Sequence, residues 1–223
     1  MGYAMSSIDA SAPTQTAPSA SGWVEAPNPA ALAIARVSDA RNAIQQTITF
    51  LSPGTKTDLK KVWRNFGEPK DMPFDGLGEF SPIKSDKDFL AAISSHYQRM
   101  LGTLGKAQSL FHGISQAIVG KDAYALTLTN DRVASDPPDK SPYPPGIYFA
   151  SRFAACTDRK KTEIVIHEVA HFKDGHHFSD AYSPYGPNWG KFSGKEGILN
   201  AWSYSMLVLD VVFNRATPFP DPP

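Results

Sequence analysis

The chain has 223 residues, of which 41% are hydrophobic and 11% aromatic, so it can bury one core of ordinary size. Its 22 basic and 22 acidic residues cancel, which argues against an electrostatic grip on nucleic acid or an anionic membrane. No apolar run reaches the roughly 18–20 residues that a membrane-spanning helix needs. Cys156 is the single cysteine, so no intrachain disulfide can form and small disulfide-stabilised folds are excluded.

Both ends of the chain have a composition that predicts no packed structure. Residues 1–28 are rich in Ser, Ala, Pro and Thr, and residues 217–223 are rich in proline. We therefore expect a tail at each end and one folded domain over residues 29–216. No signal-peptide pattern follows Met1, so we expect secretion or delivery by a route without a signal peptide, with the cytoplasm as the alternative.

Apolar residues at helical spacing predict most of the domain to be helical. Pro29 favours the start of a first helix over residues 28–51, and a shorter helix is expected over residues 55–66. Ser85 predicts the capped start of a long helix whose apolar stripe extends as far as Phe111. His96 and His112 are expected on the same helix. A final helix is expected over residues 195–214.

Short strands and one further helix are predicted between these long elements. Alternating and β-branched residues predict strands over 124–129 and 147–150. The charged run 158–161 is expected to be a solvated turn before a helix over 162–172. The predicted fold class is therefore α+β, mainly helical, with a small β-sheet beside that helix.

The helix over 162–172 contains the sequence His-Glu-Val-Ala-His. Residues i and i+4 lie on one face of a helix, so His167 and His171 can bind one zinc ion together. Glu168 lies beside them, where it can reach a zinc-bound water and act as general base in hydrolysis. A pair of hydrogen-bonded core histidines is the structural alternative, but two buried imidazoles and a buried Glu need partners that a metal supplies.

A catalytic zinc site needs a third protein ligand, and the residues after His171 offer several. The candidates are His176, His177 and Asp180. His177 has the spacing of the last histidine in the metzincin pattern, but Asp174 stands where that pattern requires a glycine to turn the chain. The spacing alone therefore leaves His177 and Asp180 open.

The chain resembles the aspzincin metalloendopeptidases, which include the deuterolysins and the peptidyl-Lys metalloendopeptidases. The segments that carry the resemblance are IYFASRF, HEVAHF, FSDAYSPYG and NAWSYSM, which follow one another in the order of that family. The helices that contain VWRNFG and SHYQRM extend the likeness to roughly residues 29–214. The resemblance implies a zincin-like fold with its small sheet beside the active-site helix.

The resemblance also implies roles for particular residues. It assigns the zinc ligands to His167, His171 and Asp180, and the general base to Glu168. It further implies a tyrosine that hydrogen-bonds the oxyanion of the tetrahedral intermediate, for which Tyr185, directly before a glycine, is preferred and Tyr182 is the alternative. Trp202 replaces the Asp of the acidic pocket that selects lysine in the Lys-specific members, so we do not expect lysine specificity.

Together these features predict a zinc-dependent metalloendopeptidase that hydrolyses protein or peptide substrates through a Glu168-activated, zinc-bound water. Two alternatives stay open. One is a zincin-fold toxin or effector domain with a specific target, for example cell-wall peptide, and the other is a binding domain with little general protease activity. The presence of Glu168 argues against a catalytically dead scaffold. Neither a nucleic-acid partner nor a membrane span is expected.

Overall fold

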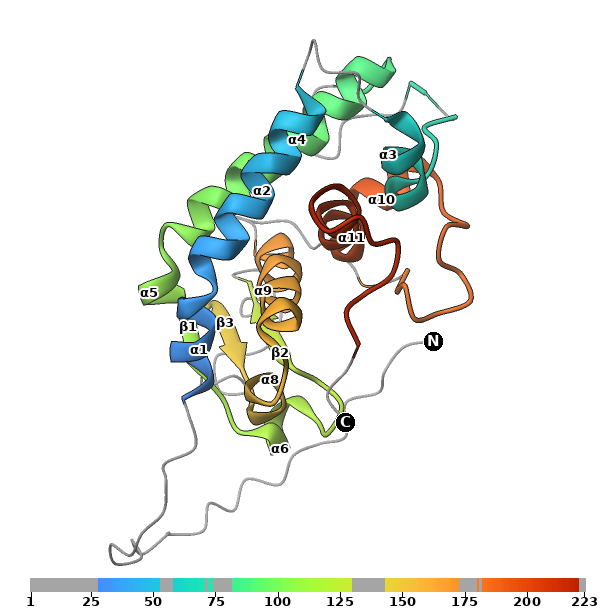
Figure 1. The fold of residues 1–223 in the computed structure, drawn as a ribbon. Helices are drawn as coiled ribbons and strands as arrows, with labels where there is room; N and C mark the ends of the chain where they lie inside the picture. The colour runs from blue at the N-terminus through green and yellow to red at the C-terminus, as the bar shows by residue number, and fades with distance from the viewer. Residues whose placement is uncertain are drawn as a thin grey trace, which may run out of the picture.

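The computed structural model describes residues 28–52, 58–70, 72–73, 82–129, 143–172, 180 and 182–220. Within these ranges helices surround a small three-stranded sheet, which gives the expected mixed α+β class (Figure 1). None of the helices in the described part of the chain has the length and apolar character needed to cross a membrane.

The helices differ widely in length. The longer ones are α2 (Val37–Leu51), α4 (Asp86–Leu104), α9 (Asp158–His171) and α11 (Ala201–Val212). The shorter ones are α1 (Pro29–Ala35), α3 (Leu59–Phe66), α5 (Ala107–Leu110), α6 (Gln116–Val119), α8 (Ser151–Ala154) and α10 (Gly194–Ile198). Figure 1 shows α9 near the centre of the molecule, with α2 and α4 side by side on one flank and α11 on the other.

Three strands form the described sheet in the order β1-β3-β2. They are β1 (Phe111–Gly113), β2 (Ala125–Leu128) and β3 (Gly146–Phe149). The central strand β3 is parallel to β1 and antiparallel to β2, with Thr127 opposite Ile147. Strand β2 is an edge of this sheet and packs against α9, so the sheet lies beside the His-Glu-Val-Ala-His helix as expected.

The long helix begins where the sequence predicts but ends earlier. The hydroxyl of Ser85 accepts a hydrogen bond of 3.2 Å from the backbone N–H of Asp88, which caps the start of α4. The expected apolar stripe as far as Phe111 is wrong at its end, because α4 stops at Leu104 and Phe111 begins β1. His112 therefore lies in a strand and not on the long helix.

Two other predicted helices are divided by a single break. The helix expected over 28–51 is interrupted at Arg36, and the helix expected over 195–214 is interrupted at Leu199 and Asn200. At the first break the Arg36 guanidinium lies 3.0 Å from the carboxylate of Asp158 at the start of α9. Apolar spacing continues across both breaks, so it does not reveal a local change in backbone direction.

The charged run 158–161 is the first turn of α9, in which Asp158 and Arg159 are exposed, but the prediction of a solvated turn is wrong for Lys160 and Lys161. Lys160 is only 1% exposed and Lys161 only 8%. Each is buried beside a carboxylate one helical turn away: Lys160 Nζ lies 3.0 Å from Glu163, and Lys161 Nζ lies 3.8 Å from Asp158. Pairing within the helix lets these cations tolerate burial that a lone charge would not.

Helices α10 and α11 pack closely against the rest of the domain, as two contacts illustrate. The hydroxyl of Tyr97 on α4 donates a hydrogen bond of 2.7 Å to the carbonyl of Tyr204 on α11. Burial raises the pKa of both tyrosines well above the usual range, so both stay neutral. Gly197 on α10 lies against α3, where an added Cβ would be 1.9 Å from the Phe66 carbonyl oxygen.

Two glycine substitutions test this packing as a matched pair. Gly197→Ala should destabilise the fold by at least about 2 kcal/mol, because its methyl group overlaps backbone that cannot move away cheaply. Gly102→Ala in α4 should stabilise it by about 0.5–1 kcal/mol, since nothing lies within 4 Å and alanine favours the helix. Denaturant unfolding of both variants decides the point, and a shift of the same sign in both would contradict the packing described.

Candidate metal centre and adjoining pocket

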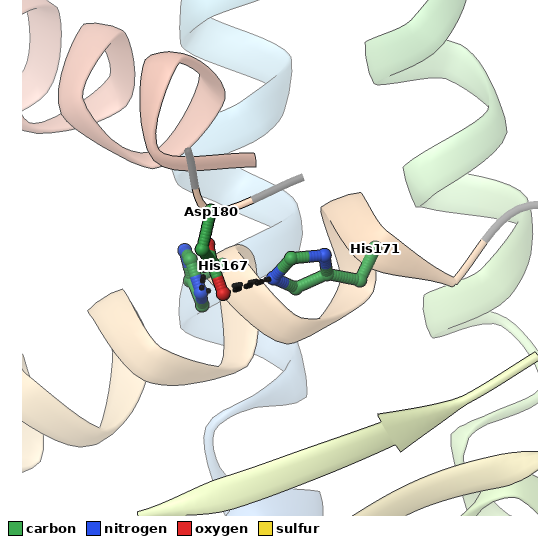
Figure 2. Close-up of side chains that lie close together, drawn as sticks. All are labelled: His167, His171 and Asp180. Atoms are coloured by element: carbon green, nitrogen blue, oxygen red, sulfur yellow. Dashed lines mark hydrogen bonds and ion pairs between the residues drawn. The ribbon is translucent and has the colours of Figure 1, made fainter. Parts of the chain in front are cut away.

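Helix α9 places His167 and His171 one turn apart with their rings nearly perpendicular, at 87°. Their Nε2 atoms are 3.1 Å from each other. Asp180 lies beyond the end of the helix and presents one carboxylate oxygen to each ring, 3.3 Å from His167 Nε2 and 3.2 Å from His171 Nε2 (Figure 2). The structure therefore brings these three side chains together around one point.

The separations of these donor atoms suit one metal ion. Ligand atoms bound ~2.0–2.1 Å from a tetrahedral zinc lie roughly 3.3–3.4 Å from one another. The two histidine nitrogens are 3.1 Å apart, close to one edge of such a tetrahedron, and the two oxygens of the Asp180 carboxylate face them separately, one 3.3 Å from His167 and the other 3.2 Å from His171. The group formed by His167, His171 and Asp180 could therefore hold a metal ion.

The surroundings of His167 keep its ring neutral and fixed. Burial lowers the pKa of His167 to about 3; the Asp180 carboxylate opposes this shift, while His171 and Lys160 add to it. The indole of Trp202 lies against the His167 ring with 4.1 Å between ring centroids. A neutral imidazole keeps the lone pair that a metal needs, so this environment fits a ligand.

Glu168 contacts the sheet. The residue is 8% exposed, and its Oε2 accepts a hydrogen bond of 2.6 Å from the hydroxyl of Thr127 on β2. The same hydroxyl lies 3.1 Å from the Glu168 carbonyl oxygen. Sequence reasoning did not single out Thr127, although strand alternation places it on the same face as Thr129. Glu168 is thus oriented by β2.

A cavity of about 310 Å³ begins at His167 and Glu168. It follows one face of α9 past Ile164 to Lys160, two helical turns toward the start of the helix. The segment 122–125 forms another wall, and the rings of Tyr185 and Trp202 also line it. Of the three residues that could hold a metal, His167 lines this pocket, so His167 and Glu168 open into one shared cavity.

The two tyrosines after Asp180 point in different directions. Tyr185 lines the pocket, and its hydroxyl accepts a hydrogen bond of 2.6 Å from Lys160 Nζ. Tyr182 instead donates a short hydrogen bond to Glu196 and packs its ring against Phe192. Of the two, Tyr185 is therefore the one that shares a pocket with Glu168.

Lys160 links the pocket to the C-terminal segment through Glu163. One Glu163 oxygen lies 3.0 Å from Lys160 Nζ, and the other accepts a hydrogen bond of 2.7 Å from the backbone N–H of Phe219. Burial alone would lower the pKa of Lys160, but the Glu163 carboxylate and the Tyr185 hydroxyl raise it to about 12. Phe219, which composition places in a tail, is 5% exposed and packs against α11.

Two other described histidines, His96 and His112, lie apart from this site. His96 is buried on α4 with its ring 4.3 Å from that of Tyr204, and His112 stacks on Tyr148 at 5.0 Å. His176 and His177 lie outside the described residues, so the structure does not test His177 as a ligand.

The depressed pKa of His167 predicts a pH dependence of stability in metal-free protein. Above its ordinary pKa of 6.5 the ring is neutral in both states, but between 6.5 and about 3 only the unfolded chain takes up the proton. Unfolding free energy should therefore fall as pH drops through this window, by up to about 1.4 kcal/mol per pH unit relative to His167→Gln. Unfolding in chelator from pH 7 to 4 measures it, and equal slopes for both proteins would contradict a buried, neutral His167.

Comparison with known proteins gives no match. No protein-family profile, no curated protein and no solved structure matches this chain. A functional conclusion therefore depends on the geometry of the site formed by α9, β2 and the segment after Asp180.

Proposed function

We propose that this chain is a zinc-dependent metalloendopeptidase, a hydrolase that cleaves peptide bonds in protein or peptide substrates. The observation that carries the proposal is the meeting of His167, His171 and Asp180 around one point, with Glu168 next to His167 in a pocket that both residues line. Two imidazoles and one carboxylate resemble the two-histidine, one-carboxylate sets that hold catalytic zinc.

The donor set favours zinc over the common hard cations. Calcium and magnesium prefer oxygen ligands, whereas imidazole nitrogen with one carboxylate suits zinc. Three protein ligands also leave one position of a tetrahedral ion for water or substrate, as catalysis requires. A zinc ion in this position would polarise the scissile carbonyl and make water more acidic.

Glu168 is the group that moves the proton. Its carboxylate takes a proton from water as the water oxygen bonds to the carbonyl carbon of the peptide. It then delivers that proton to the amide nitrogen as the C–N bond breaks, which gives a carboxylic acid and an amine. The hydrogen bond from Thr127 holds one carboxylate oxygen, so Glu168 has a fixed orientation for both transfers.

Tyr185 is suited to stabilise the negative charge that develops on the carbonyl oxygen. An ammonium group can only donate hydrogen bonds, so Tyr185 accepts from Lys160 and its own proton is directed away from Lys160. Because Tyr185 lines the same pocket as Glu168, we assign to it the hydrogen bond to the oxyanion. Lys160 is then a positioning residue for Tyr185.

The proposal includes the resemblance to the aspzincins. The segments that carry the resemblance adjoin the site: IYF lies in β3, HEVAHF ends α9, and NAWSYSM begins α11. Trp202 of the last segment packs on His167, so this segment contributes to the surroundings of a proposed ligand. These positions support the proposal that this site has the same arrangement of segments as the aspzincin site.

Glu168→Gln should keep the zinc and lose at least about 10²-fold in turnover, because it removes the base and no ligand. His171→Ala should lose both zinc and turnover. Glu68→Gln, a half-exposed glutamate paired with Lys70, is the matched control and should keep both. Zinc content and cleavage of an unfolded generic protein measure the effects.

Two outcomes would contradict this proposal in different ways. If Glu168→Gln cleaved the substrate near the wild-type rate, the hydrolysis would not run through this site. If the wild-type chain held zinc but cleaved no generic protein, the alternative of a specific effector or binding domain would take its place.

A further inference from the structure

The pocket beside Glu168 continues for two helical turns beyond the proposed ligands, so it contacts more of a substrate than the reacting bond. Its residues on α9 are Lys160, Ile164, His167 and Glu168, of which the first three share one face of the helix. From Lys160 to Glu168 the helix rises about 12 Å. A cavity of about 310 Å³ lies at the small end of ligand pockets, so it suits one side chain and not a large molecule.

The walls of this pocket are mostly apolar. Ile164 and two alanines of the segment 122–125 contribute aliphatic surface. Three aromatic rings, those of Tyr124, Tyr185 and Trp202, add further apolar surface. The remaining lining residues are Asp122, Lys160, His167 and Glu168. A side chain that enters is therefore removed from water onto hydrocarbon, which favours apolar groups.

The charges around the pocket disfavour a basic side chain. Lys160 Nζ lies 5.3 Å from the centre of the Tyr185 ring, and the Arg152 guanidinium lies 4.9 Å from that of Tyr124. Cations of the protein therefore already lie near two of the three rings that could attract a substrate cation, and the third, that of Trp202, packs against His167. Two carboxylates at this end, Asp122 and Glu163, are paired at 3.2 and 3.0 Å with Arg152 and Lys160.

An acidic side chain is disfavoured for a related reason. The Lys160 ammonium is buried, and it is directed at Glu163 and Tyr185. The Glu163 carboxylate cancels its charge, and the Phe219 N–H holds that carboxylate in place. An entering carboxylate would lose its hydration without meeting a net positive charge.

We propose that this pocket selects an uncharged apolar side chain next to the cleaved bond, and that Lys160, which Glu163 holds near the Tyr185 ring, is the residue that excludes basic side chains. The inference deepens the proposed function and rests on it. Lys160 thus has a specificity role in addition to its contact with Tyr185.

Binding of small hydroxamates tests the selection without turnover. The probes are peptide hydroxamates that differ only in the side chain beside the metal-binding group, which is that of leucine, phenylalanine, lysine or glutamate. Calorimetry on the zinc-loaded full chain should give Kd values at least about tenfold lower for leucine and phenylalanine than for lysine and glutamate. Equal or tighter binding of the lysine or glutamate probe, or no binding by any probe, would overturn the proposal.

A charge-free variant tests the role of the pair. Lys160→Met combined with Glu163→Gln removes both charges: the first side chain becomes one atom shorter, the second keeps its length, and its new amide oxygen can still accept from Phe219. The leucine-to-lysine affinity ratio should fall severalfold in this variant, with folding checked by circular dichroism. Lys161→Met is the matched control, because Lys161 is the next residue, is buried and paired, and does not line the pocket. An unchanged ratio in the double variant, or an equal change in the control, would overturn the assignment to Lys160.

Cleavage assays separate this inference from the proposed function. If the hydroxamates bind in the expected order but no peptide is cleaved, the hydrolase proposal fails and the selective pocket stands. If peptides are cleaved but a lysine beside the bond serves as well as leucine, the hydrolase proposal stands and the selective pocket fails.

Discussion

The burial of helix α9 is the constraint on which the rest of the structure depends. Residues 160–170 of this helix are all buried, and they include polar and charged side chains as well as apolar ones. Burying a polar group that lacks a hydrogen-bond partner costs folding free energy roughly equal to the stabilisation that several favourable contacts provide. Each surrounding element therefore has to bring a partner to α9 as well as an apolar face.

The partners come from segments far apart in the chain. Strand β2 supplies the Thr127 hydroxyl to Glu168, and the C-terminal segment supplies the Phe219 N–H to Glu163. The segment after α9 supplies Asp180 to the histidines and Tyr185 to Lys160. These contacts stabilise the buried helix and also orient the groups that the proposed chemistry uses, so stability and function draw on one set of contacts.

The sequence alone predicted those features that depend on spacing within a single helix. The four-residue interval between His167 and His171 places their rings on one face wherever the helix lies in the fold. Asp180 is different, because spacing left His177 open as well; Asp174 in place of the metzincin glycine and the resemblance to a known family favoured the aspartate. The structure places Asp180 against both histidines but does not describe His177.

Features that depend on tertiary contacts could not be predicted in this way. Lys160 and Phe219 appear in a charged run and a proline-rich end, both typical of solvated chain, yet Glu163 pairs with both and they are buried. At the helix break, Arg36 forms an ion pair with Asp158, which lies 122 positions later in the chain. Periodicity contains no information about partners at such separations.

The most direct test of the central claim is the ligand set of the bound metal. X-ray absorption at the zinc edge of the loaded protein should show two imidazole nitrogens at about 2.0–2.1 Å and oxygen ligands that complete four-fold coordination. Asp180→Ala should change this spectrum and His177→Ala should leave it as it is. A spectrum with three imidazoles, lost in His177→Ala and kept in Asp180→Ala, would contradict the account.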